Sequence, residues 1–214
     1  MAIVPVNQIE FGDVVFVERQ DDVRIIVRIP GRYLLADHRN ASGERRVFAC
    51  RAVYLSSHEI GLAAPVIGKV GERVIADFDQ LGKVEGRLVR QLERGFVMRV
   101  AANEERRRDL AAKIAWVENH KNHDAPNRRV VERIVPANPY SKIVLADGRV
   151  ETCLVLDFSV TGAAISADTV PDIRAVVAIG SVVGRVIRHF VGGFAVQFIE
   201  RQNSGTVEAL ITSE

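Results

Sequence analysis

The amino-acid sequence predicts a mainly β protein, with two small β-domains in tandem joined by one amphipathic helix and a polar linker. Short apolar runs with strand periodicity recur at close spacing on both sides of the middle of the chain, which is typical of a small barrel or sandwich. A single helical pattern, over residues 103–118, lies between the two groups of strands. A long stretch of the first half also recurs in the second half without gaps.

The composition is that of an ordinary folded protein. Of its 214 residues, 48% are hydrophobic and 26% are charged, which suits two domains of about 100 residues each. The formal net charge is only +2, so the chain lacks the global basic field of most nucleic-acid binders, and any anion site must be local. The N-terminal residues lack the pattern of a secretory signal, and no apolar run is long enough to cross a bilayer. We therefore expect a cytoplasmic protein without membrane insertion.

Residues that carry catalysis or metal binding do not cluster in the sequence. Cys50 and Cys153 each lie in a strand-like run, so we expect two buried, reduced thiols. His120 and His123 lie close together without a third metal ligand. No nucleophile, base and orienting group form a recognisable set. The sequence thus predicts no enzyme, no metal site and no cofactor.

The first half is expected to hold a series of short strands. They are Gly12–Glu18, Arg24–Leu35, Arg46–Leu55, a short strand starting at Gly61, Arg73–Phe78, Lys83–Leu92 and Phe96–Val100. Pro30 and Gly31 predict an edge, bulge or bend in the second of these strands, because proline cannot donate to a ladder.

The helix is expected over Asn103–Glu118, where no glycine or proline occurs. Asn103 can cap it, and Leu110, Ile114 and Val117 recur at helical spacing, so an apolar stripe should pack on a barrel or on a partner. We expect Trp116 to join that packing. The polar stretch 119–127 has no periodicity and marks a linker. The predicted domains are therefore residues 1–118, with the helix at their end, and residues 128–214.

The second half again shows the sequence pattern of short strands. Ser141–Ala146 and Val150–Leu156 flank Asp147-Gly148, which is a strong hairpin signal. Further strands are expected at Ala163–Ser166, Ile173–Ile179, Val182–Phe190 and Phe194–Ile199, and a short helix somewhere in 201–214.

An internal repeat relates the two halves. Gly82–Val100 aligns without gaps on Gly180–Phe198. The coinciding pairs are Gly82/Gly180, Val84/Val182, Gly86/Gly184, Arg87/Arg185, Arg90/Arg188, Gly95/Gly193 and Phe96/Phe194. Turn glycines and strand positions match together, which chance rarely produces. Upstream, we align Arg24–Arg28 with Arg129–Arg133 and Ser56–Gly61 with Asp157–Gly162.

Two short motifs in the second half contain side chains suited to binding a ligand. Arg129 and Arg133 form an Arg-x-x-x-Arg pair, and Asp157, Ser159 and Gly162 form an Asp-x-Ser-x-x-Gly turn. Arginine forks can bind phosphate bidentately or reach guanine O6 and N7. A carboxylate can accept from guanine N1–H and N2–H, a hydroxyl can donate or accept, and glycine allows a positive φ or a close approach. Taken singly, these arginines also fit solvated linker charges, and the aspartate fits a turn cap.

The two motifs at this separation, followed by glycine-punctuated strands, resemble the PilZ domain, the bacterial cyclic di-GMP receptor module. The resemblance implies a six-stranded β-barrel in each half, and it covers residues 124–200 well and the first half loosely. It implies that Arg129 and Arg133 lie on an arm that closes over cyclic di-GMP bound at the barrel. A basic residue at Arg128 is associated in the family with an intercalated nucleotide dimer. Arg188 is a further candidate contact to guanine.

The first copy departs from the motifs in the alignment given above. It keeps Arg24 and Arg28, but Ser56 and His58 stand in place of the aspartate and the serine. Neither replacement supplies a carboxylate for guanine. We therefore expect a degenerate first domain that binds cyclic di-GMP weakly or not at all.

The resemblance implies a cyclic di-GMP effector in which nucleotide binding at the second domain changes the domain arrangement or the binding of a downstream protein. Control of motility, exopolysaccharide or biofilm would be the output. A PilZ-like protein–protein interaction module that does not bind nucleotide is the alternative. A nucleic-acid-binding barrel fits poorly with the near-neutral charge and with nine Phe, three Tyr and one Trp. A homodimer is left open.

Overall fold

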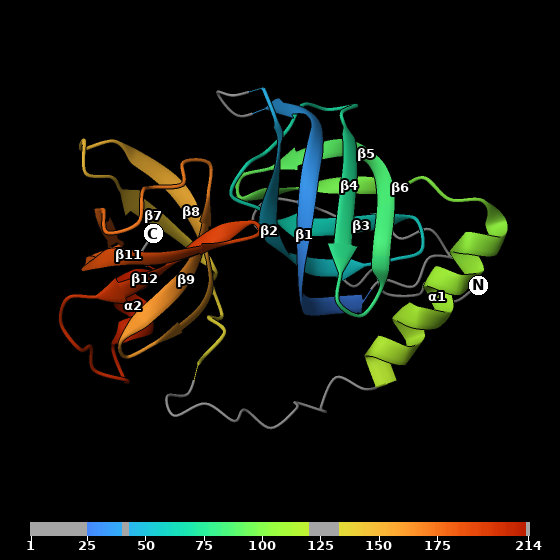
Figure 1. Ribbon diagram of the computed structural model, residues 1–214. Coiled ribbons are helices and arrows are strands. Elements are labelled where there is room, and N and C mark those ends of the chain that lie inside the picture. The colour runs from blue at the N-terminus through green and yellow to red at the C-terminus, as the bar shows by residue number, and fades with distance from the viewer. Residues whose placement is uncertain (1–24, 40–42, 120–132, 213–214) are drawn as a thin grey trace.

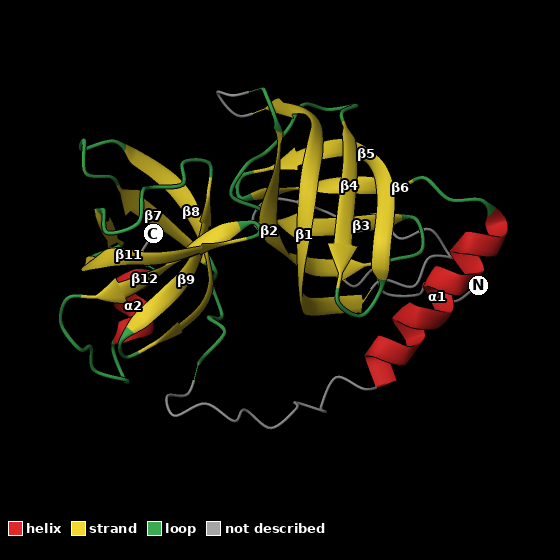
Figure 2. Ribbon diagram, in the orientation of Figure 1, coloured by secondary structure: helices red, strands yellow, loops and turns green. Residues whose placement is uncertain are grey.

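The computed structural model describes residues 25–39, 43–119 and 133–212, which fold into two closed six-stranded antiparallel barrels (Figures 1 and 2). The barrels lie side by side, and the long helix α1 lies beyond the first barrel, on the side away from the second (Figure 1). The prediction of a mainly β chain with two six-stranded barrels in tandem is confirmed. The strand expected at Gly12–Glu18 and all but the first residue of the expected linker lie outside the described residues.

The first barrel is closed by six strands in the order β1-β2-β3-β6-β5-β4. They are β1 (Ile25–Arg39), β2 (Arg45–Leu55), β3 (Glu59–Ala63), β4 (Arg73–Phe78), β5 (Gly82–Leu92) and β6 (Gly95–Val100). β1 runs unbroken through Pro30 and Gly31. The irregularity expected there lies earlier, as a register shift between Ile26 and Ile29.

The second barrel has the same construction, in the order β7-β8-β9-β12-β11-β10. Its strands are β7 (Tyr140–Val144), β8 (Val150–Ser159), β9 (Gly162–Ala167), β10 (Val176–Ile179), β11 (Val182–Phe190) and β12 (Gly193–Phe198). The turn before β8 uses Gly148 at a φ of +84°, which favours glycine. The expected short tail helix is α2 (Val207–Ile211), whose Val207 and Ile211 are buried in this barrel's core.

Strand pairing confirms the internal repeat down to its irregularities. The pairs Gly86–Val100, Leu88–Met98 and Arg90–Val97 of the first barrel recur as Gly184–Phe198, Val186–Val196 and Arg188–Ala195 in the second. A register shift between Leu88 and Arg90 recurs between Val186 and Arg188. Shared bulges are strong evidence of common descent, because bulges are specific features of a strand and not defects.

Each barrel has its own apolar core. Cys50 belongs to the first core and Cys153 to the second, and both are free, buried thiols, as expected. Burial raises the pKa of Cys50 far above its usual value and the pKa of Cys153 to about 12, because an apolar interior disfavours the thiolate.

Helix α1 (Glu104–Asn119) packs against the first barrel. The side chain of Asn103 accepts a hydrogen bond from the backbone N–H of Arg106 at 2.9 Å, which confirms the expected cap. Leu110, Ile114 and Val117 are buried and join the first core, also as expected. Trp116 is 54% exposed. The prediction that it joins the packing is therefore wrong, because it lies outside the apolar stripe of the helix.

The barrels contact each other through β2 and through two equivalent turns. The backbone N–H of Ala49 in β2 donates to the carbonyl of Gly192 in the β11–β12 turn at 3.0 Å. In return, the Tyr140 hydroxyl of the second barrel donates to the carbonyl of Arg94, in the β5–β6 turn. Gly192 has a φ of +94°, and a Cβ there would lie 2.6 Å from the backbone nitrogen of Ala49. The absence of a side chain thus lets the two backbones meet.

Candidate functional site

The described part of the predicted site lies at one end of β8 and around it. Asp157 and Ser159 close β8, and Gly162 opens β9. Arg133 lies on the segment before β7, and Arg188 lies on β11. Arg128 and Arg129 lie outside the described residues.

Arg133 and Asp157 form an ion pair that joins the two motifs. Nη1 of Arg133 donates to Oδ1 of Asp157 at 2.8 Å, with the two side chains 34% and 29% exposed. The neighbouring residues fix this geometry, because Ile134 and Phe158 exchange backbone hydrogen bonds of 2.8 and 2.9 Å in an isolated bridge. The base of the predicted arm is therefore attached to β8 directly beside Asp157.

Ser159 is a buried residue whose hydroxyl closes the β8–β9 turn. Its Oγ accepts from the backbone N–H of Thr161 at 3.3 Å and lies 3.2 Å from the Thr161 hydroxyl. It also donates to the carbonyl of Gly162 at 3.4 Å. Gly162 itself allows a close backbone approach, because a Cβ there would collide with the carbonyl oxygen of Val196. Both residues thus have a structural role in addition to the predicted ligand role.

Asp157 and Arg188 lie at the two ends of one row across four strands. Asp157 pairs with Ala164, Ala164 with Ala195, and Ala195 with Arg188. We call these four residues the Asp157 row. Three strand spacings separate its ends by about 14 Å. The middle positions are alanines, both buried, and Arg188 is exposed with its guanidinium carbon 5.7 Å from the Phe190 ring centroid. The row therefore has an acidic end, a basic end and no bulky side chain between them.

The same row in the first barrel has a different composition. It consists of Tyr54, Gly61, Val97 and Arg90, paired in the same order. Tyr54 takes the place of Asp157, and its ring packs directly against Gly61, where a Cβ would collide with it. An aromatic side chain thus covers the position that Ala164 occupies in the second barrel.

This pairing corrects our alignment of the turns. The register shift between Ala52 and Tyr54 matches the shift between Val155 and Asp157. Tyr54 is thus the counterpart of the aspartate, and Ser56 is the counterpart of Ser159. Ser56 caps its own turn in the same way, since its Oγ accepts from the backbone N–H groups of His58 at 3.2 Å and Glu59 at 2.9 Å.

The alignment of the arginines also changes. Ile25 pairs with Leu55 as Ile134 pairs with Phe158, so Arg133 corresponds to the residue before Ile25 and not to Arg28. That residue is Arg24, which lies outside the described residues, and the position four before it is Gln20. The first copy therefore lacks one arginine of the pair as well as the aspartate.

Comparisons with known proteins give only distant similarities. No protein-family profile and no curated protein matches the chain. Among solved structures, PlzA of Borreliella burgdorferi in complex with c-di-GMP is 11% identical, with 90% of this chain and 93% of that chain covered and a TM-score of 0.27. The inhibitor of motility MotI/DgrA of Bacillus subtilis is 13% identical, with coverages of 87% and 94% and a TM-score of 0.30. YcgR of Escherichia coli in complex with c-di-GMP is 15% identical, with coverages of 86% and 80% and a TM-score of 0.25.

The fold itself rests on the strand order of this chain. Each half closes six antiparallel strands, and in the second half Arg133 of one motif meets Asp157 of the other. The architecture is a tandem of two closed six-stranded barrels. Such a tandem is what the sequence predicted, and Arg133 and Asp157 do meet in space.

Sequence reasoning missed a contribution of the first barrel to this corner. Arg51, in the middle of β2, is 4% exposed and donates to the carbonyls of Pro136, three residues after Arg133, and Leu156, directly before Asp157. The available signal was an arginine within the apolar strand Phe48–Leu55. A charged residue in such a run is rarely buried without a specific partner.

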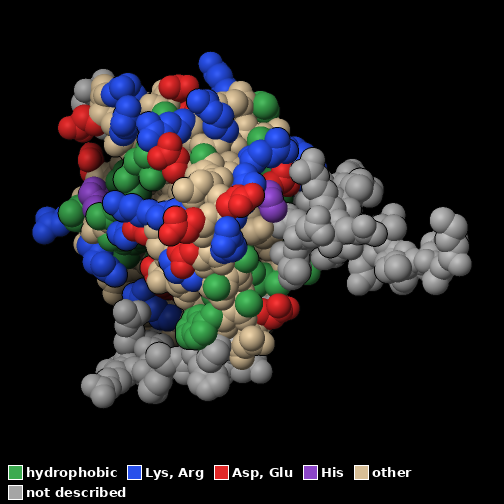
Figure 3. All heavy atoms as spheres, turned by 90° about the vertical axis from the view of Figure 1, so that its right-hand side faces the viewer, with side chains coloured by type: hydrophobic (Ala, Val, Ile, Leu, Met, Phe, Trp, Pro, Cys, Tyr) green, Lys and Arg blue, Asp and Glu red, His purple; other side chains and the backbone are tan. Residues whose placement is uncertain are grey.

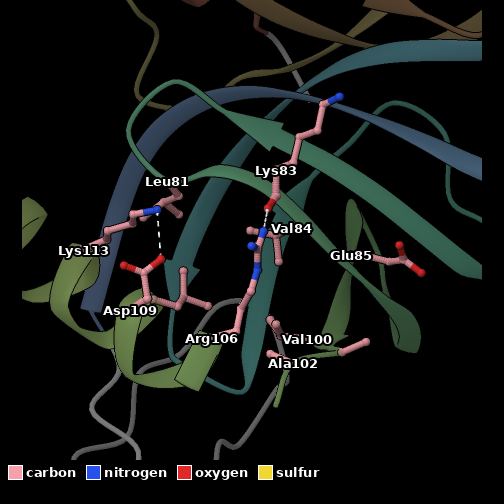
Figure 4. Close-up of a pocket in the computed structure, with 11 residues that line it drawn as sticks. Leu81, Lys83, Val84, Glu85, Val100, Ala102, Arg106, Asp109 and Lys113 are labelled. Carbon is pink, nitrogen blue, oxygen red and sulfur yellow. Dashed lines mark hydrogen bonds and ion pairs between the residues drawn. The ribbon is translucent and has the colours of Figure 1, made fainter. Parts of the chain in front are cut away.

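A hollow lies between α1 and the first barrel (Figure 4). Arg106 donates to the carbonyl of Lys83 at 3.1 Å, and Lys113 pairs with Asp109 at 3.2 Å (Figure 4). The Arg106 contact attaches the helix to β5, and the Lys113–Asp109 pair lies within the helix. On the face of the molecule that carries α1, basic and acidic side chains are interspersed (Figure 3), so this hollow has no dominant charge for a ligand.

Two further findings concern metal binding and membrane-spanning helices. In residues 25–39, 43–119 and 133–212, no three His, Cys, Asp or Glu side chains are placed to hold a metal ion. Within the same ranges, no helix is long and apolar enough to cross a membrane.

Proposed function

We propose that this chain is a cytoplasmic, non-catalytic effector that binds cyclic di-GMP at its second barrel. The observation that carries the proposal is the Arg133–Asp157 pair at the acidic end of the Asp157 row, in the barrel with both PilZ motifs. The first barrel has Tyr54 at that position and supplies no carboxylate. The difference between two otherwise equivalent barrels lies at the residues expected to recognise guanine.

The chemistry of the ligand matches these groups one by one. Guanine presents adjacent N1–H and N2–H donors, which the carboxylate of Asp157 can accept. The phosphates and the O6 and N7 edge suit the forks of Arg128, Arg129 and Arg133, and Arg188 can reach a second base or phosphate. Guanidinium planes also stack on purines. Ser159 and Gly162 hold the turn that keeps Asp157 at its edge.

Binding would exchange one set of contacts for another. Asp157 is paired with Arg133, and both side chains are about one-third exposed. Pairs with this exposure contribute only about 0–1 kcal/mol to stability, so the cost of opening the pair is small. The released carboxylate can then accept from guanine while the released guanidinium binds phosphate.

This exchange of contacts would also affect how the two barrels are held relative to each other. Arg133 follows the segment that connects the two barrels, so contacts between this segment and a ligand would change the restraints between them. We propose that this change alters the domain arrangement or the binding of a downstream protein, with motility, exopolysaccharide or biofilm control as the output. We propose that the first barrel binds the nucleotide weakly or not at all.

Titration calorimetry with cyclic di-GMP tests the proposal. We expect micromolar or tighter binding by the full chain, because several charge-assisted hydrogen bonds form at once. Arg129→Ala and Asp157→Ala should each weaken binding by about 10- to 100-fold, since a hydrogen bond to a charged group contributes about 1.5–3 kcal/mol. Asp147→Ala is the matched control, because Asp147 pairs with Arg149 in the same barrel but lies in the β7–β8 turn.

Millimolar or absent binding by the unaltered chain would overturn the receptor proposal. It would favour the second candidate, a PilZ-like interaction module that has lost nucleotide binding, which the first barrel illustrates with its tyrosine-filled row. Partner capture that is independent of cyclic di-GMP would be the positive sign of that alternative.

A further inference from the structure

Arg51, the buried arginine of β2, belongs to neither motif. Its guanidinium lies between the barrels, with Nη1 2.9 Å from the carbonyl oxygen of Pro136 and Nη2 3.2 Å from that of Leu156. Both recorded acceptors are main-chain carbonyls of the second barrel. The planar fork of arginine reaches the two acceptors from two separate nitrogens, whereas a lysine would have to reach both from one nitrogen.

Burial of this cation is costly, so its place requires a reason. The interior disfavours the charged form and lowers the pKa of Arg51, and the positive charge of Arg28 lowers it further. Among the described residues, its recorded hydrogen bonds go to neutral carbonyls and not to a carboxylate. A neutral apolar residue would seal the interface at lower cost. The reason for a buried arginine must therefore lie in where its two carbonyl acceptors are placed.

The two carbonyls lie beside the corner where Arg133 and Asp157 meet. Leu156 directly precedes Asp157 in β8, and Pro136 lies three residues after Arg133. Both residues lie on the same side of the Ile134–Phe158 bridge, which attaches the base of the arm to β8. One guanidinium from the first barrel thus links β8 to the segment that carries Arg133.

We propose that Arg51 is a positioning residue for the ligand site of the second barrel, which makes that site dependent on the first barrel. Arg51 holds the base of the arm against β8, so that Arg133 and Asp157 face the same ligand. This inference rests on the proposed cyclic di-GMP function. It also gives the degenerate first barrel a role, because Arg51 of that barrel supports a ligand site that lies in the second barrel.

The chain offers a matched control in the same strand. Arg46, also in β2, donates to the carbonyl of Ala167 at 3.1 Å and lies 3.4 Å from Asp168. It therefore links the same two barrels through the same kind of contact. Its acceptors lie at the end of β9, away from Asp157 and Arg133. Loss of Arg46 should disturb the interface but not the site.

The first measurement needs no ligand. Backbone amide exchange is followed in the full chain, at Ile134 and Phe158, for Arg51→Met and Arg46→Met. Loss of two buried hydrogen bonds from a charged group should lower protection at both amides by about tenfold or more in Arg51→Met. Arg46→Met should leave both amides within about twofold, because it does not touch this bridge. Equal effects of the two variants would overturn the inference.

The second measurement is titration with cyclic di-GMP. We expect about tenfold weaker binding by Arg51→Met and less than twofold change for Arg46→Met. Arg51→Lys keeps the charge but not the fork, so it should recover little of the affinity. If the unaltered chain does not bind, the proposed function fails while the exchange result still decides the role of Arg51. If the chain binds and Arg51→Met binds equally well, the positioning role is wrong.

Discussion

At one row of the sheet the two barrels carry different side chains, Asp157 in the second and Tyr54 in the first. Around this difference the turns are alike, since Ser159 and Ser56 each cap the turn that follows with a side-chain oxygen. The serine is therefore retained where the carboxylate is lost. A residue shared by both copies supports the turn, and a residue present in only one copy is the better candidate for ligand recognition.

The two serines provide an internal comparison of structure and binding. Ser159→Ala and Ser56→Ala should each destabilise the fold by about 1 kcal/mol, because each removes hydrogen bonds within a turn. Ser159→Ala alone should also weaken cyclic di-GMP binding, by about threefold or more, if its hydroxyl contacts the ligand. Thermal unfolding and calorimetry measure the two effects separately. Equal losses of stability without any change in affinity would remove Ser159 from the ligand site.

Residue types in the motifs could be recognised from the sequence, but their partners could not. That Arg133 and Asp157 meet was predicted, because both motifs belong to one module. That Arg51 crosses from the other barrel to hold Pro136 and Leu156 was not predictable. Its role depends on the packing of one barrel on the other, and strand periodicity contains no information about that packing.

At the scale of elements, most strands could be placed from periodicity and from turn glycines, and the repeat identified β5–β6 with β11–β12 correctly. The alignment failed where a bulge intervenes. We matched Gly61 to Gly162 because both are glycines at a turn, but they serve different needs. Gly61 makes room for the Tyr54 ring, and Gly162 makes room for the carbonyl of Val196. A sequence shows a glycine without showing what approaches it.

The role of Gly162 at the start of β9 can be tested by stability. Gly162→Ala would bring a methyl group into the carbonyl of Val196, so β9 and β12 must move apart locally. Overpacking of this kind costs about 1–3 kcal/mol. Gly205→Ala is the control in the same barrel, because a Cβ there meets only the side-chain oxygen of Asn203, at 3.3 Å. It should change stability by less than about 0.5 kcal/mol. Similar melting temperatures for both variants would contradict the packing role of Gly162.

At the scale of the whole molecule, the two barrels form a reciprocal pair. The carbonyls of Gly192 and Arg94, at equivalent turns, each accept a hydrogen bond from the opposite barrel. His38 and Arg46 of the first barrel add contacts of 3.1 and 3.4 Å to Asp168 of the second. Separate cores suggest two folding units, but these contacts and the buried Arg51 predict that the units open together. The tandem would then transmit a change at the second barrel to the first.

The two cysteines report on this coupling, because each barrel contains one. Burial raises both thiol pKa values, that of Cys153 to about 12, so in the folded chain neither thiol ionises near neutral pH. Alkylation of either thiol therefore requires the barrel to open. It is faster above pH 9.0, the usual thiol pKa, because the thiols of the unfolded chain ionise there and their ionisation also favours opening.

In mild denaturant we expect Cys50 and Cys153 to be alkylated at rates within about twofold of each other, as measured by peptide mass spectrometry. In Arg51→Met the two rates should diverge, since the barrels are then held by fewer contacts. Unequal rates in the unaltered chain would show that the barrels open independently, and the first barrel could not then sense a ligand at the second through this interface.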